Sequence, residues 1–224
     1  FNITGSSQAD TITGGAQADT ITAGSGDDTI SGGNDSDTII LGTNLTSSDT
    51  IDGGAGTDEL RFTDSGSATS DLDGVTNVET VTLGDAATSV TTVDALVGSG
   101  QTLTVSAAAL TGANALTWDG AAETNGSFNI TGSSQADTVT GGNGDDIITG
   151  GDGTDTVTAG SGDDTISGGN DADTIIFGSS LTTSDTIDGG AGTDELRFTD
   201  SGSATSDLDG VTNVETVTLG DAAT

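Results

Sequence analysis

Aspartate is the residue type that recurs in this sequence at a spacing suited to chemistry. It holds the sixth place of all nine nonapeptides in residues 5–40 and 132–176, and an aliphatic residue holds the eighth place of each. After a three-residue phase slip, the same pairing resumes twice in each block. Oxygen ligands in flexible glycine turns, without imidazole or thiolate, suit calcium better than other common cations. The predicted metal ligands are Asp10, Asp19, Asp28, Asp37, Asp49, Asp58, Asp137, Asp146, Asp155, Asp164, Asp173, Asp185 and Asp194.

The composition excludes several classes of function. The 224 residues carry 36 acidic and 2 basic side chains, a formal net charge of -34, with no His and no Cys. Such a charge repels nucleic acid and anionic membranes. Without His or Cys, the usual zinc sites, thiolate catalysis, Ser-His-Asp triads and disulfides are also excluded. No apolar run approaches the ~20 residues of a membrane span, so we expect no membrane insertion.

The elements that must position the aspartates are short strands between turns. In a three-residue strand with Ile12 pointing inward, Thr11 and Thr13 point outward, which leaves about one core aliphatic residue per nonapeptide. Two nonapeptides for each coil would stack carboxylates 18 residues apart on one edge. The predicted pairs are Asp10 with Asp28, Asp19 with Asp37, Asp137 with Asp155, Asp146 with Asp164, and Asp155 with Asp173.

The nonapeptides lie within a larger repeat. Residues 1–10 return unchanged as 128–137, 127 residues later, and residues 48–88 return as 184–224, 136 residues later. The difference, 136 - 127 = 9, means that the second copy gained one nonapeptide. By the two-per-coil arrangement this is half a coil, which would place the following elements on opposite sides. We expect the sequence to be an excerpt of a longer tandem array.

These nonapeptides resemble the glycine- and aspartate-rich GGxGxDxUx repeats of the RTX family of secreted bacterial proteins, over residues 5–62 and 132–198. The resemblance implies an all-β fold, a parallel β-roll or β-solenoid, whose turns bind several calcium ions in each copy. It also implies export by a type I system, and ligands from backbone carbonyls of two successive turns. Carbonyl ligands are expected at Gly15, Gly32, Asn34, Gly142, Gly144, Gly150, Gly151, Gly153, Ala159, Ser161, Gly168 and Asn170.

Some turns depart from that pattern at the fourth, glycine-preferring place. Gln8, Gln17 and Gln135 stand there, so we expect the first turns of each copy to bind calcium more weakly or not at all. Asp35 and Asp171 also stand there, and aspartate tolerates a left-handed backbone better. The turns 141–146 and 150–155 fit the pattern best. The turns before Asp49 and Asp185 fit it least, which makes these two aspartates less secure ligands.

The chain divides into four segments: a calcium-binding block at 1–62, a connecting segment at 63–127, a second block at 128–198, and the start of a second connecting segment at 199–224. Alternating Thr and aliphatic residues predict strands in the connecting segment. It either continues the solenoid with longer coils, which we favour, or forms a compact sandwich. Trp118 is expected to pack in its core rather than bind a ligand.

Two outliers have a structural and a functional interpretation. Arg61 and Arg197, each in the string Asp-Glu-Leu-Arg-Phe, are expected to pair with the glutamate two residues earlier on the same strand face, the alternative being a cation that replaces metal at the end of the ladder. Thr-x-Thr strands are good outward β sequences, with an ice-binding surface as a minor alternative.

The sequence predicts a calcium-dependent structural module of a secreted or surface-exposed bacterial protein, such as an S-layer, adhesin or extracellular fibre. We expect it to fold on meeting extracellular calcium and to associate with itself or with neighbouring copies of the array. The alternative is a secretion and folding module attached to an RTX toxin or exoenzyme. Because paired carboxylates recur at every turn, whereas a catalytic site is singular, we do not expect an enzyme.

Overall fold

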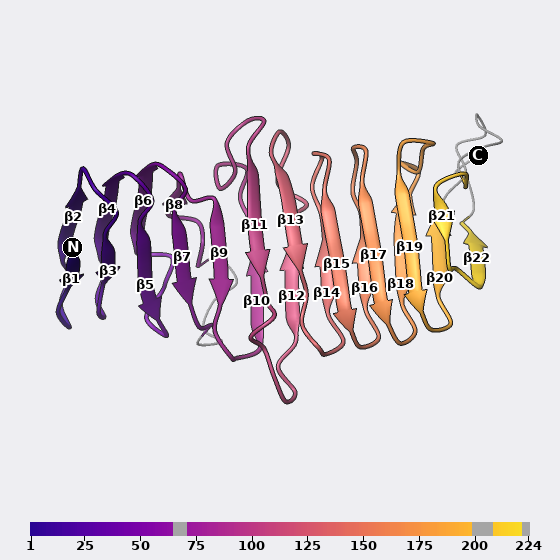
Figure 1. The fold of residues 1–224 in the computed structure, drawn as a ribbon, viewed down its shortest axis with the longest axis horizontal. Coiled ribbons are helices and arrows are strands. Elements are labelled where there is room, and N and C mark those ends of the chain that lie inside the picture. The colour runs from indigo at the N-terminus through magenta and orange to yellow at the C-terminus, as the bar shows by residue number, and fades with distance from the viewer. Residues whose placement is uncertain (65–70, 199–207, 221–224) are drawn as a thin grey trace.

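The chain folds into a parallel β-solenoid, described here for residues 1–64, 71–198 and 208–220 of a computed structural model. The strands lie side by side along the long axis of the molecule, with the two termini at opposite ends (Figure 1). Every pair of neighbouring strands is parallel, and the described residues contain no helix. The predicted fold class is therefore confirmed. Of the segment 199–224, residues 199–207 and 221–224 lie outside the described residues.

Three sheets make up the two broad faces of the solenoid. The first has eleven strands: β1 (Asn2–Thr4), β3 (Thr20–Thr22), β5 (Thr38–Gly42), β7 (Glu59–Phe62), β9 (Thr80–Leu83), β11 (Thr102–Ser106), β13 (Ser127–Thr131), β15 (Ile147–Asp152), β17 (Thr165–Asn170), β19 (Thr186–Ala191) and β21 (Val211–Thr212). The second has four strands: β2 (Thr11–Gly15), β4 (Thr29–Asn34), β6 (Thr50–Ala55) and β8 (Val75–Thr76). The third has seven: β10 (Thr88–Thr91), β12 (Leu116–Asp119), β14 (Thr138–Thr140), β16 (Thr156–Thr158), β18 (Thr174–Gly178), β20 (Glu195–Phe198) and β22 (Thr216–Leu219).

The aliphatic residue at the eighth place of each nonapeptide forms the core of the calcium-binding blocks. Ile21 lies in register with Ile39, and Ile39 with Leu60, so that like side chains stack from coil to coil. All three are fully buried. Ile12 is also buried between Thr11 and Thr13, which are exposed, as the alternation of a strand requires.

Several strands are longer than the three residues that the repeat predicts. β4 continues from Thr29 through two glycines to Asn34, and Gly33 pairs with Gly15 on the preceding coil. Gly33 has φ 115°, and a Cβ placed on it would lie 2.1 Å from the carbonyl oxygen of Gly15. The paired glycines therefore extend the strands around the corner, where any side chain would separate the coils.

The connecting segment continues the same solenoid. β9 and β11 join β7 to β13 within the eleven-stranded sheet, which passes through the segment without a break. Its core is broader than that of the blocks, because loops as well as strands contribute buried apolar side chains, including Leu72, Val78, Leu96, Val97, Leu103, Val105, Leu110, Leu116 and Trp118. The segment therefore forms longer coils of one solenoid, and no separate sandwich is present in its described residues.

The additional nonapeptide of the second copy shifts every later element to the other face. The strand β7 belongs to the eleven-stranded sheet, whereas β20, which has the same sequence, belongs to the seven-stranded sheet. In the same way β6 lies in the four-stranded sheet and its counterpart β19 in the eleven-stranded sheet. Nine residues therefore act as half a coil, as predicted.

Candidate metal sites

The thirteen periodic aspartates form ladders that run from coil to coil. In each step the Oδ1 atom accepts a hydrogen bond from the backbone N–H one coil earlier, with N···O distances of 2.8 Å for Asp19 to Asp37 and 2.9 Å for Asp146 to Asp164. All thirteen carboxylates except that of Asp10 are buried. The ladders are Asp10–Asp28–Asp49, Asp19–Asp37–Asp58, Asp137–Asp155–Asp173–Asp194 and Asp146–Asp164–Asp185.

Each of the five aspartate pairs predicted from the 18-residue spacing occupies neighbouring rungs of one ladder. Across the phase slip the interval becomes 21 residues, as between Asp28 and Asp49, and the ladder still continues. The same geometry includes Asp49 and Asp185, the ligands that the sequence supports least. The structure therefore brings all thirteen predicted side chains into the ladders.

Whether the second carboxylate oxygen has a partner depends on the second residue of the turn. Where that residue is a glycine with positive φ, as at Gly151 before Asp155, its N–H does not reach the Oδ2 atom. Where it has ordinary φ, as at Ser133, its N–H donates to Oδ2 of Asp137 at 2.6 Å. The buried Oδ2 atoms without a hydrogen-bond partner are those of Asp19, Asp37, Asp58, Asp155, Asp164, Asp173 and Asp194.

Five of the other six aspartates have their Oδ2 atoms capped by the backbone; the exception is Asp28, whose turn has Gly24 with positive φ in second place. The N–H groups of Ser6 and Gly142 cap Asp10 and Asp146 in this way. In the turns without glycine, the N–H of Thr46 caps Asp49, and that of Thr182 caps Asp185. The turn 141–146 thus differs from 150–155, although both fit the repeat equally well in sequence.

At the first glycine of most turns, oxygens from two coils converge on the position that a Cβ would take, which is called here an oxygen-lined space. A Cβ placed on Gly150 would lie 2.3 Å from Oδ2 of Asp155 and 2.5 Å from the carbonyl oxygen of Gly168, on the next coil. A carboxylate of one turn and a carbonyl of the next therefore converge where a side chain is absent. The same arrangement occurs at Gly5, Gly14, Gly32, Gly53, Gly132, Gly141 and Gly168.

The twelve carbonyls predicted as ligands fall into three groups of four. Those of Gly32, Gly150, Ala159 and Gly168 face these spaces, each from the coil that follows. Those of Gly15, Gly142, Gly144 and Gly151 instead lie against a glycine of the next coil. For Asn34, Gly153, Ser161 and Asn170 the structure brings no carbonyl to such a space. The sequence did not indicate four carbonyls that do face one: Ala23, Gly53, Asn77 and Gly189.

The left-handed backbone at the fourth place follows the prediction. Asp35 and Asp171 adopt φ of 63° and 73°. The three glutamines at this place have no such φ. Weak calcium binding by the turns that contain Gln8, Gln17 and Gln135 remains a prediction.

Burial of these carboxylates disfavours their charged form. It raises the pKa of Asp155 and Asp164 to about 7, and the pKa of Asp146 and Asp173 to about 6. The backbone hydrogen bonds to Oδ1 oppose this rise, whereas like-charged neighbours add to it. A bound divalent cation would oppose this rise in pKa, because its positive charge favours the charged form of the carboxylate.

The two edges of the solenoid differ within each copy. One edge, here called the glycine edge, has glycine in the first two places of turns 14–19, 32–37 and 53–58, and of turns 150–155, 168–173 and 189–194. All six of its aspartates keep an unpartnered Oδ2. On the opposite edge, Ala23 and Ala159 put a methyl group at the first place, and the turns before Asp49 and Asp185 have no glycine.

The glycine edge changes sides between the copies. Its turns lead into β3, β5 and β7 of the eleven-stranded sheet in the first copy, but into β16, β18 and β20 of the seven-stranded sheet in the second. Because strands on the two faces run in opposite directions around the coil, these turns lie at opposite edges. The added nonapeptide thereby moves the glycine edge, with its unpartnered Oδ2 atoms, to the other side of the solenoid.

Three glutamates belong to this arrangement and were missed from the sequence: Glu79, which is partly buried, Glu215, which is exposed, and Glu123, which is buried. Glu79 accepts the N–H of Asp58, and Glu215 that of Asp194, each with N···O of 2.8 Å, so each forms the last rung of a ladder. Each follows its aspartate by 21 residues, the interval of the phase slip, and this spacing could have identified them. Glu123 is buried in the connecting segment, where no sequence repeat indicates it.

The two arginines and Trp118 have structural roles. Each arginine pairs with the glutamate two residues earlier, at 2.7 Å, and about half of its side chain is exposed. Trp118 is buried and packs edge-on against Phe128, with ring centroids 5.6 Å apart. The predicted ion pair and core packing are therefore confirmed.

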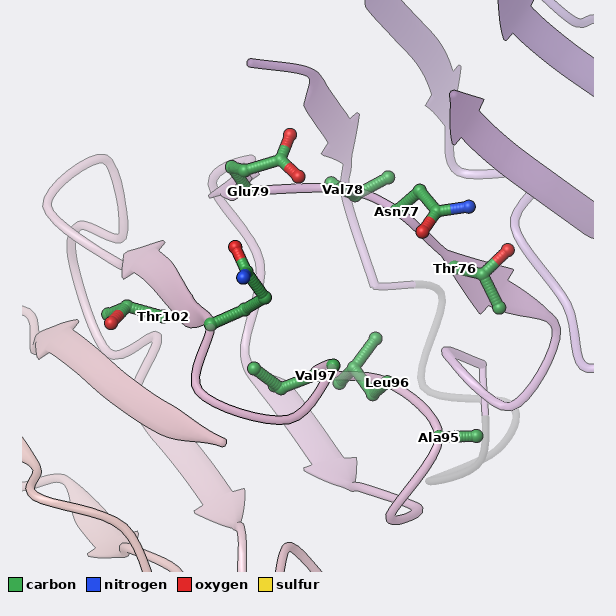
Figure 2. Close-up of a pocket in the computed structure, with 10 residues that line it drawn as sticks. Thr76, Asn77, Val78, Glu79, Ala95, Leu96, Val97 and Thr102 are labelled. Carbon is green, nitrogen blue, oxygen red and sulfur yellow. The ribbon is translucent and has the colours of Figure 1, made fainter. Parts of the chain in front are cut away.

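A pocket of about 300 Å³ lies in the connecting segment, between residues 76–79 and residues 95–102. Figure 2 shows Thr76, Asn77, Val78 and Glu79 along one wall, with Leu96 and Val97 opposite. Glu79 is the single titratable group among the residues that line it. The pocket therefore lacks the paired carboxylates that acid–base hydrolysis requires.

In the described part of the chain, no three acidic side chains gather around one point as in a compact metal centre. A cation would therefore be held by carboxylates of two successive turns together with backbone carbonyls. Over the same residues, no helix is long and apolar enough to span a membrane.

Comparison with known proteins agrees with this geometry. A family model described as the RTX calcium-binding nonapeptide repeat (4 copies) matches residues 4–39, 46–62, 129–157, 149–180 and 182–198, more than half of the chain. No match was found among curated proteins.

Proposed function

The chain belongs to the RTX calcium-binding nonapeptide repeat family, and from this premise we propose that it is a structural module whose two blocks, 1–62 and 128–198, fold into a rigid rod on binding several calcium ions each. The connecting segment 63–127 joins the blocks. No catalytic role is assigned to the chain, because its repeated carboxylates have one shared structural task.

The observation that carries this proposal is the row of buried, unpartnered Oδ2 atoms on the glycine edge. A buried anionic oxygen without a partner is costly, and several in succession repel one another. Five of these six Oδ2 atoms converge with a carbonyl oxygen of the next coil at the first glycine of their turn, as Oδ2 of Asp155 does with the carbonyl of Gly168. An all-oxygen set at a glycine turn fits calcium, which accepts six to eight oxygens at variable geometry.

The chain's own residues explain why folding should depend on the ion. Bound calcium supplies the positive charge that the two basic residues cannot supply to 36 acidic ones. Without it, the aspartates of adjacent coils repel, and a block that buries about one aliphatic residue per nonapeptide has little else to hold its coils together. An ion bound by the folded state alone shifts the equilibrium toward folding as its concentration rises.

We further propose that the module belongs to a secreted or surface-exposed bacterial protein, such as an S-layer, adhesin or extracellular fibre. RTX repeats typically occur in extracellular proteins. Two nearly identical copies in one uninterrupted solenoid suit an array better than a single roll attached to a toxin or exoenzyme.

The test is a calcium titration followed by far-ultraviolet circular dichroism, beginning in chelator. We expect the β signal to appear cooperatively as calcium is added. The Asp155→Asn variant keeps an Oδ1 acceptor but loses the charged Oδ2, so its titration midpoint should move to higher calcium. The matched control, Asp188→Asn, alters an aspartate outside the ladders and should leave the midpoint in place. A full β signal in chelator that calcium does not change would refute the proposal.

A further inference from the structure

The loop 123–128, which has no nonapeptide sequence, occupies the place of a calcium turn one coil before the turn 141–146. The N–H of Asn143 donates to the carbonyl of Glu123 at 3.1 Å, as the N–H of Ser161 donates to that of Gly142 at 2.9 Å one coil later. The N–H of Phe128 donates to Oδ1 of Asp146 at 2.7 Å, as a ladder aspartate does. The loop therefore has the register of a motif turn, with Phe128 where the aspartate would be.

Glu123 supplies this loop with the carboxylate that Phe128 lacks. Its side chain is 0% exposed. The Oε1 atom accepts the N–H groups of Thr124, Asn125 and Gly126 at 3.1, 3.1 and 2.8 Å, which hold the carboxylate in one orientation. The Oε2 atom is buried and has no hydrogen-bond partner. Such an oxygen is the same kind of feature as the uncommitted Oδ2 atoms of the glycine edge.

The side chain of Glu123 lies against the turn that follows. A Cβ placed on Gly142 would be 3.0 Å from Cβ of Glu123 and 3.4 Å from its Cγ. In the same turn, a Cβ placed on Gly141 would be 2.3 Å from Oδ2 of Asp146 and 2.2 Å from the carbonyl oxygen of Ala159. The carbonyl oxygens of Glu123 and Ala159 and the Oδ2 atom of Asp146 thus lie around the Gly141–Gly142 corner, beside the aliphatic part of the Glu123 side chain.

We propose that Glu123 is a calcium ligand outside the nonapeptide motif, in a site formed between loop 123–128 and turn 141–146. The site begins the ladder Asp146–Asp164–Asp185 and joins the connecting segment to the second block. It needs two carboxylates, with the remaining ligands from the backbone, in agreement with the absence of a three-acid group from the described residues. This inference rests on the proposed calcium binding.

Terbium luminescence provides a local test, because Tb³⁺ replaces calcium at oxygen sites and is excited by a nearby indole. Trp118 is the one tryptophan, and no tyrosine is present. It packs against Phe128, whose N–H is bonded to Asp146, so it lies closer to this site than to the sites at either end of the rod. The tryptophan-sensitised emission should therefore report the sites at the start of the second block, namely this site and the one at Asp137, whose Oδ1 accepts the N–H of Leu116, above the sites at the ends of the rod.

The informative variant is Glu123→Gln, because the amide keeps an oxygen for the three N–H groups and removes the charge from the Oε2 position. We expect at least a tenfold weaker Tb³⁺ affinity in the sensitised signal, and one calcium ion fewer per chain by native mass spectrometry. The Glu195→Gln control, at the partly exposed ion pair with Arg197, should match the wild type in both.

The possible outcomes separate the two proposals. If the wild type binds calcium and Glu123→Gln binds the same number of ions with the same sensitised affinity, the assignment of Glu123 is wrong. If the wild type binds neither ion, the proposed function fails and the assignment fails with it. Should Glu123→Gln not fold in calcium, Glu123→Asp replaces it, and wild-type emission from that variant would contradict the assignment.

Discussion

The calcium-binding blocks and the connecting segment share one sheet but bury different chemistry. In the blocks, each turn except that of Asp10 buries an aspartate, and most of the buried apolar side chains are single aliphatic residues on the strands, such as Ile39 and Ile148. In the connecting segment, both strands and loops bury larger apolar groups, including Trp118, Leu110 and Leu103. The coil thus combines a narrow aliphatic ladder with carboxylates in its turns in one region, and has a broader hydrocarbon core in the other.

This difference shows that a solenoid coil can be stabilised in two ways. A hydrocarbon core stabilises the fold under any ionic condition, because burying apolar surface needs no partner from solution. A carboxylate ladder stabilises the fold only when a cation offsets its charge. The connecting segment should therefore be the calcium-independent part of the rod.

Removing calcium should produce the largest contrast between the two regions. With calcium held below saturation by chelator, amide hydrogen exchange should accelerate by orders of magnitude in 5–62 and 132–198. In 71–127 exchange should accelerate later and less, since its core remains. Exchange followed by peptide mass spectrometry would resolve the regions. Equal acceleration along the chain would mean that the solenoid is a single cooperative unit and would contradict the comparison.

A large-to-small substitution in the connecting segment should destabilise the rod whether or not calcium is saturating. Leu103 is buried on β11, and Leu103→Ala should lower the free energy of unfolding by about 2–5 kcal/mol. Denaturant unfolding monitored by Trp118 fluorescence, with saturating calcium and with calcium held just above the folding midpoint, would give the two values. A loss that appears only at low calcium would mean that the core and the ladder are not independent.

Filling one oxygen-lined space should weaken calcium binding without a comparable loss of core packing. In Gly150→Ala, the new methyl group would lie within 2.5 Å of two oxygens, so we expect the calcium midpoint to rise about tenfold, which corresponds to about 1.4 kcal/mol. Gly98→Ala is the matched control, since its methyl group meets nothing closer than 3.4 Å and needs no positive φ. Isothermal titration calorimetry would compare them, and equal affinities would exclude this space as part of a site.

The pH dependence should be opposite to that of an ordinary salt-bridged protein. Burial raises the pKa of Asp155 and Asp164 from 3.8 to about 7, so in chelator the folded state binds protons that the unfolded state releases. This contribution is fully present below about pH 4 and is lost as the pH rises through about 7. The β signal in chelator should therefore increase on acidification, as measured by circular dichroism. In calcium, protons compete with the ion, so the midpoint should rise at acidic pH.

Much of this architecture was predictable from the sequence, because it depends on periodicity. The 18-residue interval identified the carboxylates that share a ladder, and the half coil of nine residues identified the change of face. The cap on Oδ2 was not predictable, because it depends on the φ of the second turn residue. Gly142 and Gly151 are the same residue in equivalent places, yet Gly142 lies against Glu123 and caps its aspartate, whereas Gly151 does not. Glu123 itself follows no repeat.

The smallest effect should come from removing one of the two arginines, and it separates a surface ion pair from a ladder cation. If Arg61 replaced a metal at the end of the ladder Asp19–Asp37–Asp58, Arg61→Gln would leave the charges of Glu79 and Asp58 without a neighbouring cation. The calcium midpoint would then shift. The guanidinium instead bonds to Glu59 on the outward face of β7 and is about half exposed, while Glu79 accepts the N–H of Asp58 on the inner side. An exposed pair of this kind contributes about 0.2–1 kcal/mol. We therefore expect Arg61→Gln to leave the calcium midpoint within twofold of the wild type in the circular dichroism titration. A shift as large as that expected for Gly150→Ala would instead mean that Arg61 acts as a cation in the ladder.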